Sequence, residues 1–283
     1  VRTLVDESQE AGTYTLTVSA ENMATDHALA AAVSERARGR LGEAASASAS
    51  GLTQGAEPWD AVLRLYTWSR PTVSFGRNEP AEGIYDPTLA GRLGVDVVRR
   101  PTGGRAVLHD AELTYAVMVP TRALGGARAT YHAVSDALVD AMQMLGADVA
   151  RSGPPSGGTL PLDAGPCFQS PAEGEVVTHG RKLVGSAQAR IDGALLQHGS
   201  IIISGDQTLL TTLGPGVAHE QPATLAEQIG RVSVEEVADA VVSSMKKVFG
   251  GTWVEGEYSG DEKQMITDLA TARYGSDEWT WRR

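Results

Sequence analysis

The stretch from Gly174 to Ser204 constrains the fold of this chain more strongly than any other part of the sequence. It holds three strand-like segments, and two short turn signals, His179-Gly180 and Asp192-Gly193, separate them. A two-residue turn that ends in glycine is typical of the connection between antiparallel strands. The stretch therefore predicts three consecutive strands in one antiparallel sheet.

Elsewhere, helical segments lie between clusters of strands. Apolar residues at helical spacing predict helices at 22–38, 129–147 and 233–250. Asn22 can cap the first helix, and Ser233 with Glu236 forms a capping box at the start of the last. Further strands are expected at 61–68, 71–76, 95–100 and 112–120. This order predicts a single α+β domain over residues 1–283, with mixed, mostly antiparallel sheets flanked by helices.

Two segments have the composition of loops. Residues 41–58 are small, polar and low in complexity, which predicts a flexible surface insertion. Residues 152–166 are rich in glycine and proline and run up to Cys167, the single cysteine of the chain. We therefore expect a loop near 150–167 that presents this cysteine.

Composition and charge disfavour several classes of protein. The formal net charge of −11 disfavours nucleic-acid binding, which needs a basic field to displace counterions. No apolar run approaches the roughly 18 residues of a membrane span, and the first residues lack the order of a signal peptide. The six histidines are scattered and have no cysteine partner, so we expect no metal site. A single cysteine fits a reducing compartment, and we expect a cytoplasmic protein.

Cys167 has two interpretations. In the simpler interpretation it is a small core residue, because free cysteines are often buried. Against it, Cys167 follows a glycine- and proline-rich loop, where site residues are more frequent than core residues. Lys182 follows within the next pair of strands, and an ammonium group near a thiol favours the reactive thiolate. The spacing permits this pair and does not decide between the interpretations.

A second candidate site surrounds Gly103 and Gly104. Adjacent glycines let the backbone approach a ligand closely, and neighbouring arginines add positive charge, although a tight turn with solvated arginines explains the same pattern. His109 and Asp110 are neighbours in a strand and face opposite sides, so one of them is expected to be structural. His198 lies in an apolar strand, where a core histidine with satisfied hydrogen bonds is the simpler interpretation.

Several motifs, in a fixed order along the chain, carry a resemblance to a known family. They are "NMATDHAL" at 22–29, "RRPTGGRAVLHDAELTYAV" at 99–117, "CF" at 167–168, "GRKLVGSAQAR" at 180–190, "LLQHGSI" at 195–201 and "RYGSDEW" at 273–279. Together they resemble the biotin/lipoate protein ligase superfamily, and within it the Firmicute-type octanoyltransferases. The resemblance spans about 22–279. It implies a biotin/lipoate ligase-type catalytic domain, with a fold like that of lipoate-protein ligase A and the class II aminoacyl-tRNA synthetases.

The resemblance also implies an activity. Such enzymes transfer an octanoyl group through a cysteine thioester in lipoate biosynthesis, without a cofactor. The matching nucleophile is Cys167, and Lys182 is implied to lower the pKa of its thiol. The implied substrate-binding residues are Arg100, Thr102, Gly103, Gly104, His109, Gly185, Ser186, Ala187, His198 and Gly199. The donor would be octanoyl-acyl carrier protein, and the acceptor a lipoyl-domain protein such as the glycine cleavage H protein or a dehydrogenase E2 subunit.

Two other functions remain open. ATP-dependent lipoate–protein ligases usually carry a third glycine where this chain has Arg105, and they need no cysteine. A non-catalytic acyl-binding module would keep the pocket without turnover. Because the implied partner proteins are usually acidic, as this chain is, we also expect a local basic face. Its candidates are Arg99, Arg100, Arg105, Arg181 and Arg190.

Overall fold

The computed structural model describes residues 1–5, 16–17, 19–48, 59–153, 173–214 and 221–282. In this part of the chain, nine strands form a large sheet. They are β1 (Arg2–Val5), β2 (Leu16–Thr17), β3 (Val62–Trp68), β7 (Glu112–Pro120), β8 (Ala150–Arg151), β9 (Val176–Thr178), β10 (Arg181–Ile191), β11 (Ala194–Ile202) and β12 (Val254–Glu255). The strand order is β12-β1-β3-β7-β11-β10-β9-β8, with β2 beside β3. All neighbours from β3 to β8 are antiparallel, whereas β1, β2 and β12 join in parallel. The predicted α+β class is confirmed.

The three-strand unit predicted at the outset forms the β11-β10-β9 part of this sheet, and β8 is added at its edge. β9 and β10 meet through a turn at His179 and Gly180, where φ is +47° and +81°. β10 and β11 pair from Val184↔Ile201 to Ile191↔Ala194, and Asp192 in their turn has a φ of +50°. Both turns use the left-handed region, which matches the right-handed twist of the paired strands.

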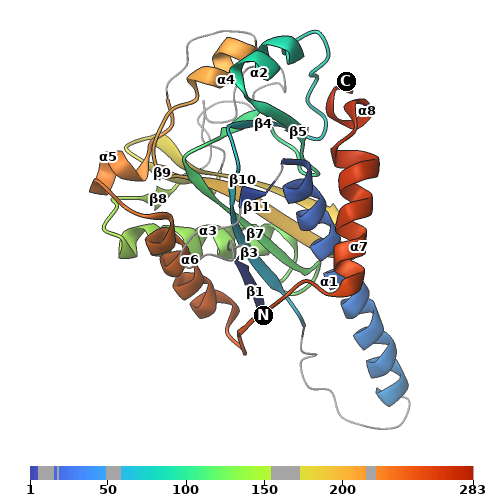
Figure 1. The fold of residues 1–283 in the computed structure, drawn as a ribbon. Coiled ribbons are helices and arrows are strands. Elements are labelled where there is room, and N and C mark those ends of the chain that lie inside the picture. Colours follow the sequence, from blue (N-terminus) through green and yellow to red (C-terminus); the bar gives the residue numbers. More distant parts are fainter. Residues whose placement is uncertain (6–15, 18, 49–58, 154–172, 215–220, 283) are drawn as a thin grey trace.

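A second sheet of three strands, in the order β5-β4-β6, lies beside the first (Figure 1). Its strands are β4 (Thr72–Phe75), β5 (Asp96–Arg99) and β6 (Val107–His109), and the helices next to it are α2 (Pro87–Leu93) and α4 (Thr208–Leu213). Phe75, Leu108 and Leu210 belong to the small apolar cluster that joins these elements.

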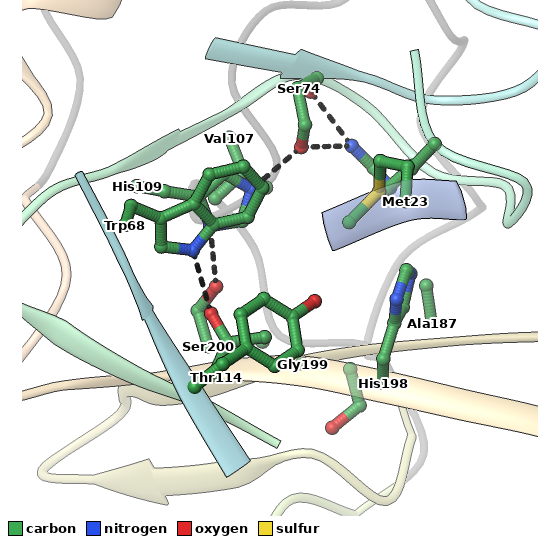
Figure 2. A pocket seen from close by; sticks show the side chains of 14 residues that line it. Met23, Trp68, Ser74, Val107, His109, Thr114, Ala187, His198, Gly199 and Ser200 are labelled. Atoms are coloured by element: carbon green, nitrogen blue, oxygen red, sulfur yellow. Dashed lines mark hydrogen bonds between the residues drawn. The ribbon is translucent and has the colours of Figure 1, made fainter. Parts of the chain in front are cut away.

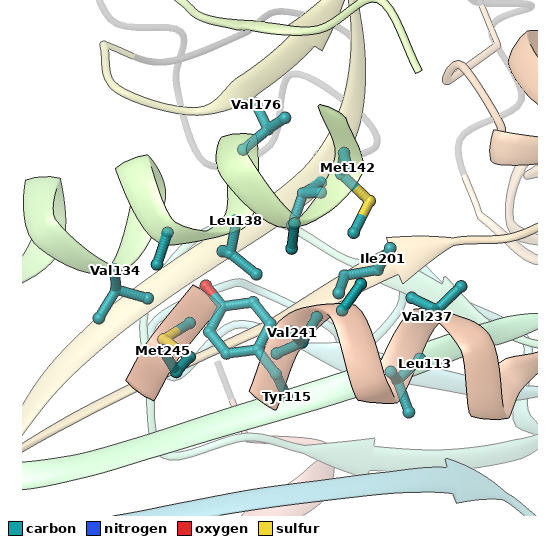
Figure 3. Packing of buried hydrophobic residues seen from close by; sticks show 14 of the residues in the cluster. Leu113, Tyr115, Val134, Leu138, Met142, Val176, Ile201, Val237, Val241 and Met245 are labelled. Carbon is teal, nitrogen blue, oxygen red and sulfur yellow. The ribbon is translucent and has the colours of Figure 1, made fainter. Parts of the chain in front are cut away.

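Helices cover both faces of the large sheet. They are α1 (Ser19–Ser48), α3 (Ala127–Met144), α5 (Leu225–Ile229), α6 (Val234–Phe249), α7 (Gly260–Leu269) and the π-helical turn η2 (Ala270–Tyr274). The short helix α8 (Asp277–Thr280) contacts β5 of the small sheet. On one face α3 and α6 pack over a core that includes Leu113, Leu138 and Val241 (Figure 3). On the other face α1 and α7 lie side by side (Figure 1), over a core that includes Leu29 and Met118.

The observed helix ends can be compared with those predicted from the sequence. Ser233 caps α6, and its hydroxyl accepts from the Glu236 amide while the Glu236 side chain accepts from the Ser233 amide, as predicted. α1 runs past its predicted end at residue 38 to Ser48, so the first part of the expected insertion at 41–58 is helical. The low-complexity sequence is rich in alanine, the best helix former. Residues 49–58 lie outside the described residues, and the division into one domain stays a prediction.

Candidate active site

A narrow cavity lies where α1 meets the large and small sheets (Figure 2). Met23 of α1 and His198 of β11 lie on one side of it, and Trp68 and His109, whose rings stack, lie on the other. Predicted site residues that line it are Arg100, His109, Gly185, Ser186, Ala187, His198 and Gly199. The structure therefore brings together residues from motifs that are far apart in the sequence.

Close backbone approach explains the glycines around this cavity. A Cβ atom at Gly199 would overlap the carbonyl oxygen of Gly185 on the paired strand, so β10 and β11 accept only glycine there. A Cβ at Gly76 would likewise overlap the carbonyl oxygen of Gly104, which itself has a φ of +90°. The space around Gly103 is open, and ligand binding by this loop stays a prediction.

His198 sits at the centre of a buried polar chain. Its Nδ1 lies 2.9 Å from Asp26 Oδ2, and its Nε2 lies 2.7 Å from the Thr102 hydroxyl. Burial lowers the pKa of His198, so the ring is neutral at pH 7. The Nδ1–H then donates to the carboxylate, and Nε2 accepts from Thr102. Both nitrogens are occupied, as expected for a satisfied core histidine, although the ring also lines the cavity.

Asp26 is a residue that sequence reasoning missed. Its carboxylate is fully buried and accepts from Arg64 Nη1 at 2.9 Å and from the Tyr66 hydroxyl at 3.0 Å, besides His198. Asp26 lies within the motif "NMATDHAL", which we used only for helix prediction and family resemblance. An acidic residue on the apolar stripe of a helix needs a buried partner, and that signal was available in the sequence.

His109 is held in a second network on the opposite wall. Its Nε2 lies 2.7 Å from the Ser74 hydroxyl, and its Nδ1 lies 2.8 Å from Glu112 Oε1. The ring stacks on Trp68 with centroids 4.2 Å apart (Figure 2). The neighbouring Asp110 is exposed, so the two residues face opposite sides, as predicted.

The basic face expected from the sequence does not form as predicted. Arg99 is fully buried and donates to the carbonyl oxygens of residues such as Gly76, Glu79 and Arg282. Arg100 and Arg105 are buried as well, and Arg100 donates to the carbonyl oxygens of Ser74, Gly103 and Arg105. These arginines stabilise loop backbones because a glycine-rich loop leaves many carbonyl groups without a strand partner.

The other two candidates for this face are also engaged. Arg181 is bound to Glu227 at 2.7 Å and to the backbone of Pro222. The exposed Arg190 donates to the carbonyl oxygen of Asp192. The five arginines therefore do not form a single surface for an acidic partner.

Lys182 lies on β10, three residues before the part of that strand that lines the cavity, and its side chain is 1% exposed. Its Nζ lies 2.7 Å from Glu175 Oε1, and this carboxylate is 4% exposed. A buried ammonium group needs such a partner, because burial without one favours loss of its proton. Cys167 lies outside the described residues, so its proximity to Lys182 stays a prediction.

Glu175 is a second residue that sequence reasoning missed. Lys182 pairs with Val177 across the β9–β10 hairpin, and Glu175 stands two residues before Val177, diagonal to the lysine. Diagonal neighbours on one face of a hairpin are within reach of long side chains. The predicted turn at His179-Gly180 already fixed this register, so the pair could have been found from the sequence.

The described part of the chain holds no group of three or more His, Cys, Asp or Glu residues that could bind a metal ion. None of its helices is long and apolar enough to cross a membrane.

A large mixed sheet, a smaller sheet beside it and a cavity between them define an α+β domain with an internal site. The chain belongs to the family of lipoyl protein ligase A/B catalytic domains, whose model matches residues 19–246. The family predicted from the sequence motifs is confirmed.

Curated relatives carry a more specific name. An octanoyltransferase LipM from Symbiobacterium thermophilum is 37% identical over 241 residues, which is 78% of this chain and 87% of the relative. An octanoyltransferase LipM from Exiguobacterium is 32% identical and covers 94% of this chain and 95% of the relative.

Solved structures support the fold. Lipoate-protein ligase A bound with ATP superposes with a TM-score of 0.73 at 21% identity, covering 99% of this chain and 98% of the other. A bipartite lipoate protein ligase from Thermoplasma acidophilum superposes with a TM-score of 0.70, also at 21% identity, and covers 100% and 97% of the two chains. At this identity the likeness concerns the fold alone.

Proposed function

We propose that this protein transfers an octanoyl group from octanoyl-acyl carrier protein to a lysine of a lipoyl domain, through a thioester on Cys167. The observation that carries the proposal is the buried ion pair between Glu175 and Lys182, which lies on the strand that lines the cavity. The octanoyltransferase relatives, 37% and 32% identical, support the same reaction. The expected cytoplasmic location belongs to this proposal.

The proposed reaction consists of two successive acyl transfers. In the first, the Cys167 thiolate attacks the carbonyl carbon of the donor thioester, a new carbon–sulfur bond forms, and the carrier thiolate leaves. In the second, the acceptor lysine amine attacks the acyl-enzyme, an amide forms, and the Cys167 sulfur leaves as the amine loses a proton. The first step exchanges one thioester for another, and the second is driven by the stability of the amide.

Lys182 would stabilise the thiolate of Cys167, and Glu175 would position Lys182. A buried ammonium is costly without an anion, and the carboxylate at 2.7 Å provides one. An ammonium group has three N–H donors, which suffice for a carboxylate and a sulfur atom together. Glu175 is therefore a positioning residue, which acts on the cysteine through the lysine.

The cavity would hold the acyl chain. Its present volume of about 30 Å³ has room for about two water molecules, which is too little for eight carbons. Met23 on its wall has an unbranched, flexible side chain that can move aside. On the wall formed by β10 and β11, Ala187 and the glycines carry little or no side chain and leave space for the acyl chain. Binding of the donor is thus expected to widen the cavity.

A transfer assay tests the proposal. Octanoyl-carrier protein and a lipoyl domain are mixed with the enzyme without ATP, and octanoyl-lysine is measured by mass. Product without ATP, with ping-pong kinetics and complete loss in Cys167→Ala, supports the transferase. Product that requires ATP and survives Cys167→Ala supports a ligase. Binding of octanoate without product supports a non-catalytic module.

A further inference from the structure

One arginine from the first third of the sequence and two from the stretch 273–282 gather near the C-terminal end of the described chain. Arg273 and Arg282 both approach the ring of Trp279, with guanidinium carbons 4.5 and 3.7 Å from its centroid. Arg282 Nη2 also donates to the carbonyl oxygen of Arg77 at 2.8 Å. Burial, followed by Arg77 and Arg273, lowers the pKa of Arg282. We call Arg77, Arg273 and Arg282 the arginine cluster.

The arginine cluster lacks an acidic partner within the described chain. No carboxylate of the described residues lies within 4 Å of these three guanidinium groups. The neighbouring His27 adds no charge at pH 7, because burial and then Arg273 lower its pKa to about 4. Positive charges that no carboxylate compensates attract an anion. Such an arrangement indicates a site that an anion completes.

The backbone around the arginine cluster is held rigidly. Arg99, itself fully buried, donates to the carbonyl oxygens of Gly76, Trp279 and Arg282 and so joins two of the three cluster segments. The third segment is the π-helical turn η2, which contains Arg273. The backbone segments that carry the cluster are thus held in place before any ligand arrives, which lowers the entropic cost of binding.

The arginine cluster also borders the cavity. The Arg77 amide donates to the Thr102 carbonyl at 2.7 Å, and the Thr102 hydroxyl contacts His198 of the cavity wall. On α1, His27 lies one helical turn after Met23, which lines the cavity, and its Nδ1 is 3.5 Å from Arg273 Nη1. An anion bound here would lie close to a ligand in the cavity.

We propose that the arginine cluster binds a phosphate group, and that this is the phosphodiester linking the thiol arm of the acyl donor to its carrier protein. The inference rests on the proposed function. Planar guanidinium forks match phosphate oxygens, and three of them from separate segments suit one compact anion. The site offsets the repulsion between an acidic carrier protein and a chain with a net charge of −11.

The test compares two small donors that differ by one phosphate. Octanoyl-phosphopantetheine and octanoyl-pantetheine are reacted with the enzyme at low ionic strength, and the acylation rate constants are measured. We expect the phosphorylated donor to react about tenfold faster with the wild type. In the triple variant Arg77→Gln, Arg273→Gln, Arg282→Gln the ratio of the two rates falls to about one.

A matched variant controls for loss of charge. Arg92, Arg122 and Arg231 are exposed and lie outside the arginine cluster, and replacing all three by glutamine removes the same charge. This variant should keep the tenfold ratio. Equal rates with both donors in the wild type, or a ratio that survives in the cluster variant, would overturn the proposal.

Two further measurements distinguish the proposal from alternative roles of the arginine cluster. If the cluster variant loses rate with octanoyl-carrier protein but keeps the ratio between the small donors, the arginines contact the protein surface and the phosphate assignment is wrong. Calorimetry with phosphopantetheine itself needs no turnover. Heat of binding in the wild type that the cluster variant lacks supports the site even if acyl transfer fails, and the absence of that heat in the wild type overturns it.

Discussion

At the scale of single residues, the account depends on which charges are buried and what holds them. Lys182 and Glu175 are buried together, and so are Arg64 and Asp26. The family motifs predicted Lys182 because it sits inside a recognisable sequence. They did not predict Glu175 or Asp26, although the register of the β9–β10 hairpin and the apolar stripe of α1 carried the signal for each.

Glu175→Gln should make Cys167 less reactive at neutral pH. Without the carboxylate, the buried Lys182 ammonium is no longer compensated and tends to lose its proton, so the thiolate loses its cation. We expect the midpoint of the pH profile of iodoacetamide alkylation to rise by about one pH unit or more. Glu173→Gln removes an exposed carboxylate two residues away and should leave the profile unchanged. An unshifted midpoint in Glu175→Gln would show that Glu175 has only a structural role.

Ala187→Leu should obstruct the acyl chain. Ala187 lines the narrow cavity, and a larger side chain there removes space that the substrate needs. We expect the KM for octanoyl-carrier protein to rise about tenfold, because about 1.4 kcal/mol of binding free energy is lost. Ala189→Leu adds the same bulk two residues along β10, outside the cavity lining, and should change KM little. Equal effects of the two variants would place the acyl chain elsewhere.

At the scale of secondary-structure elements, the sequence predicted best the features that depend on a few neighbouring residues, namely turns and helix caps. The turns at His179-Gly180 and Asp192-Gly193 and the capping box of Ser233 and Glu236 formed as expected. α1 is longer than its apolar pattern predicts, because the low-complexity sequence that follows is rich in alanine, which favours helix. The π-helical turn at Ala270–Tyr274 has no local signature, and the packing of Tyr274 against His27 accompanies it.

The contact between α1 and η2 should make stability depend on pH. His27 Nδ1 lies 2.8 Å from the Tyr274 hydroxyl, and burial, followed by Arg273, lowers the pKa of His27 to about 4. The unfolded chain takes up this proton near pH 6.5, so the unfolded state binds more protons between pH 6.5 and 4. The free energy of unfolding should therefore fall as the pH drops through this window. Urea titrations should show a shallower fall in His27→Gln, and an unchanged slope would contradict the assignment.

At the scale of the whole molecule, one buried arginine connects parts of the chain that no sequence pattern relates. Arg99 on β5 donates to the carbonyl oxygens of Gly76 and Glu79 and to those of Trp279, Thr280 and Arg282 near the C-terminal end. Sequence reasoning placed Arg99 on a basic surface, because charge alone suggests exposure. Its guanidinium nitrogens instead donate to backbone carbonyl groups of both segments, which is a role that only the tertiary structure defines.

Arg99→Lys should therefore destabilise the protein although it conserves the charge. Lysine has three donors and no planar fork, so several buried carbonyl groups lose their partner. We expect the free energy of unfolding in urea to fall by about 3 kcal/mol. Arg92→Lys, on the exposed side of α2, should change it by less than about 0.5 kcal/mol. Similar values for the two variants would show that the carbonyl contacts contribute little.

The most direct test of the account is the intact mass of the enzyme after mixing with octanoyl-carrier protein and no acceptor. We predict that the mass rises by one octanoyl group, that peptide mapping places this group on Cys167, and that adding a lipoyl domain removes it. Cys167→Ala should take up no acyl group. An unmodified wild-type enzyme that still produces octanoyl-lysine, or an acyl group on any other residue, would contradict a reaction that passes through this cysteine.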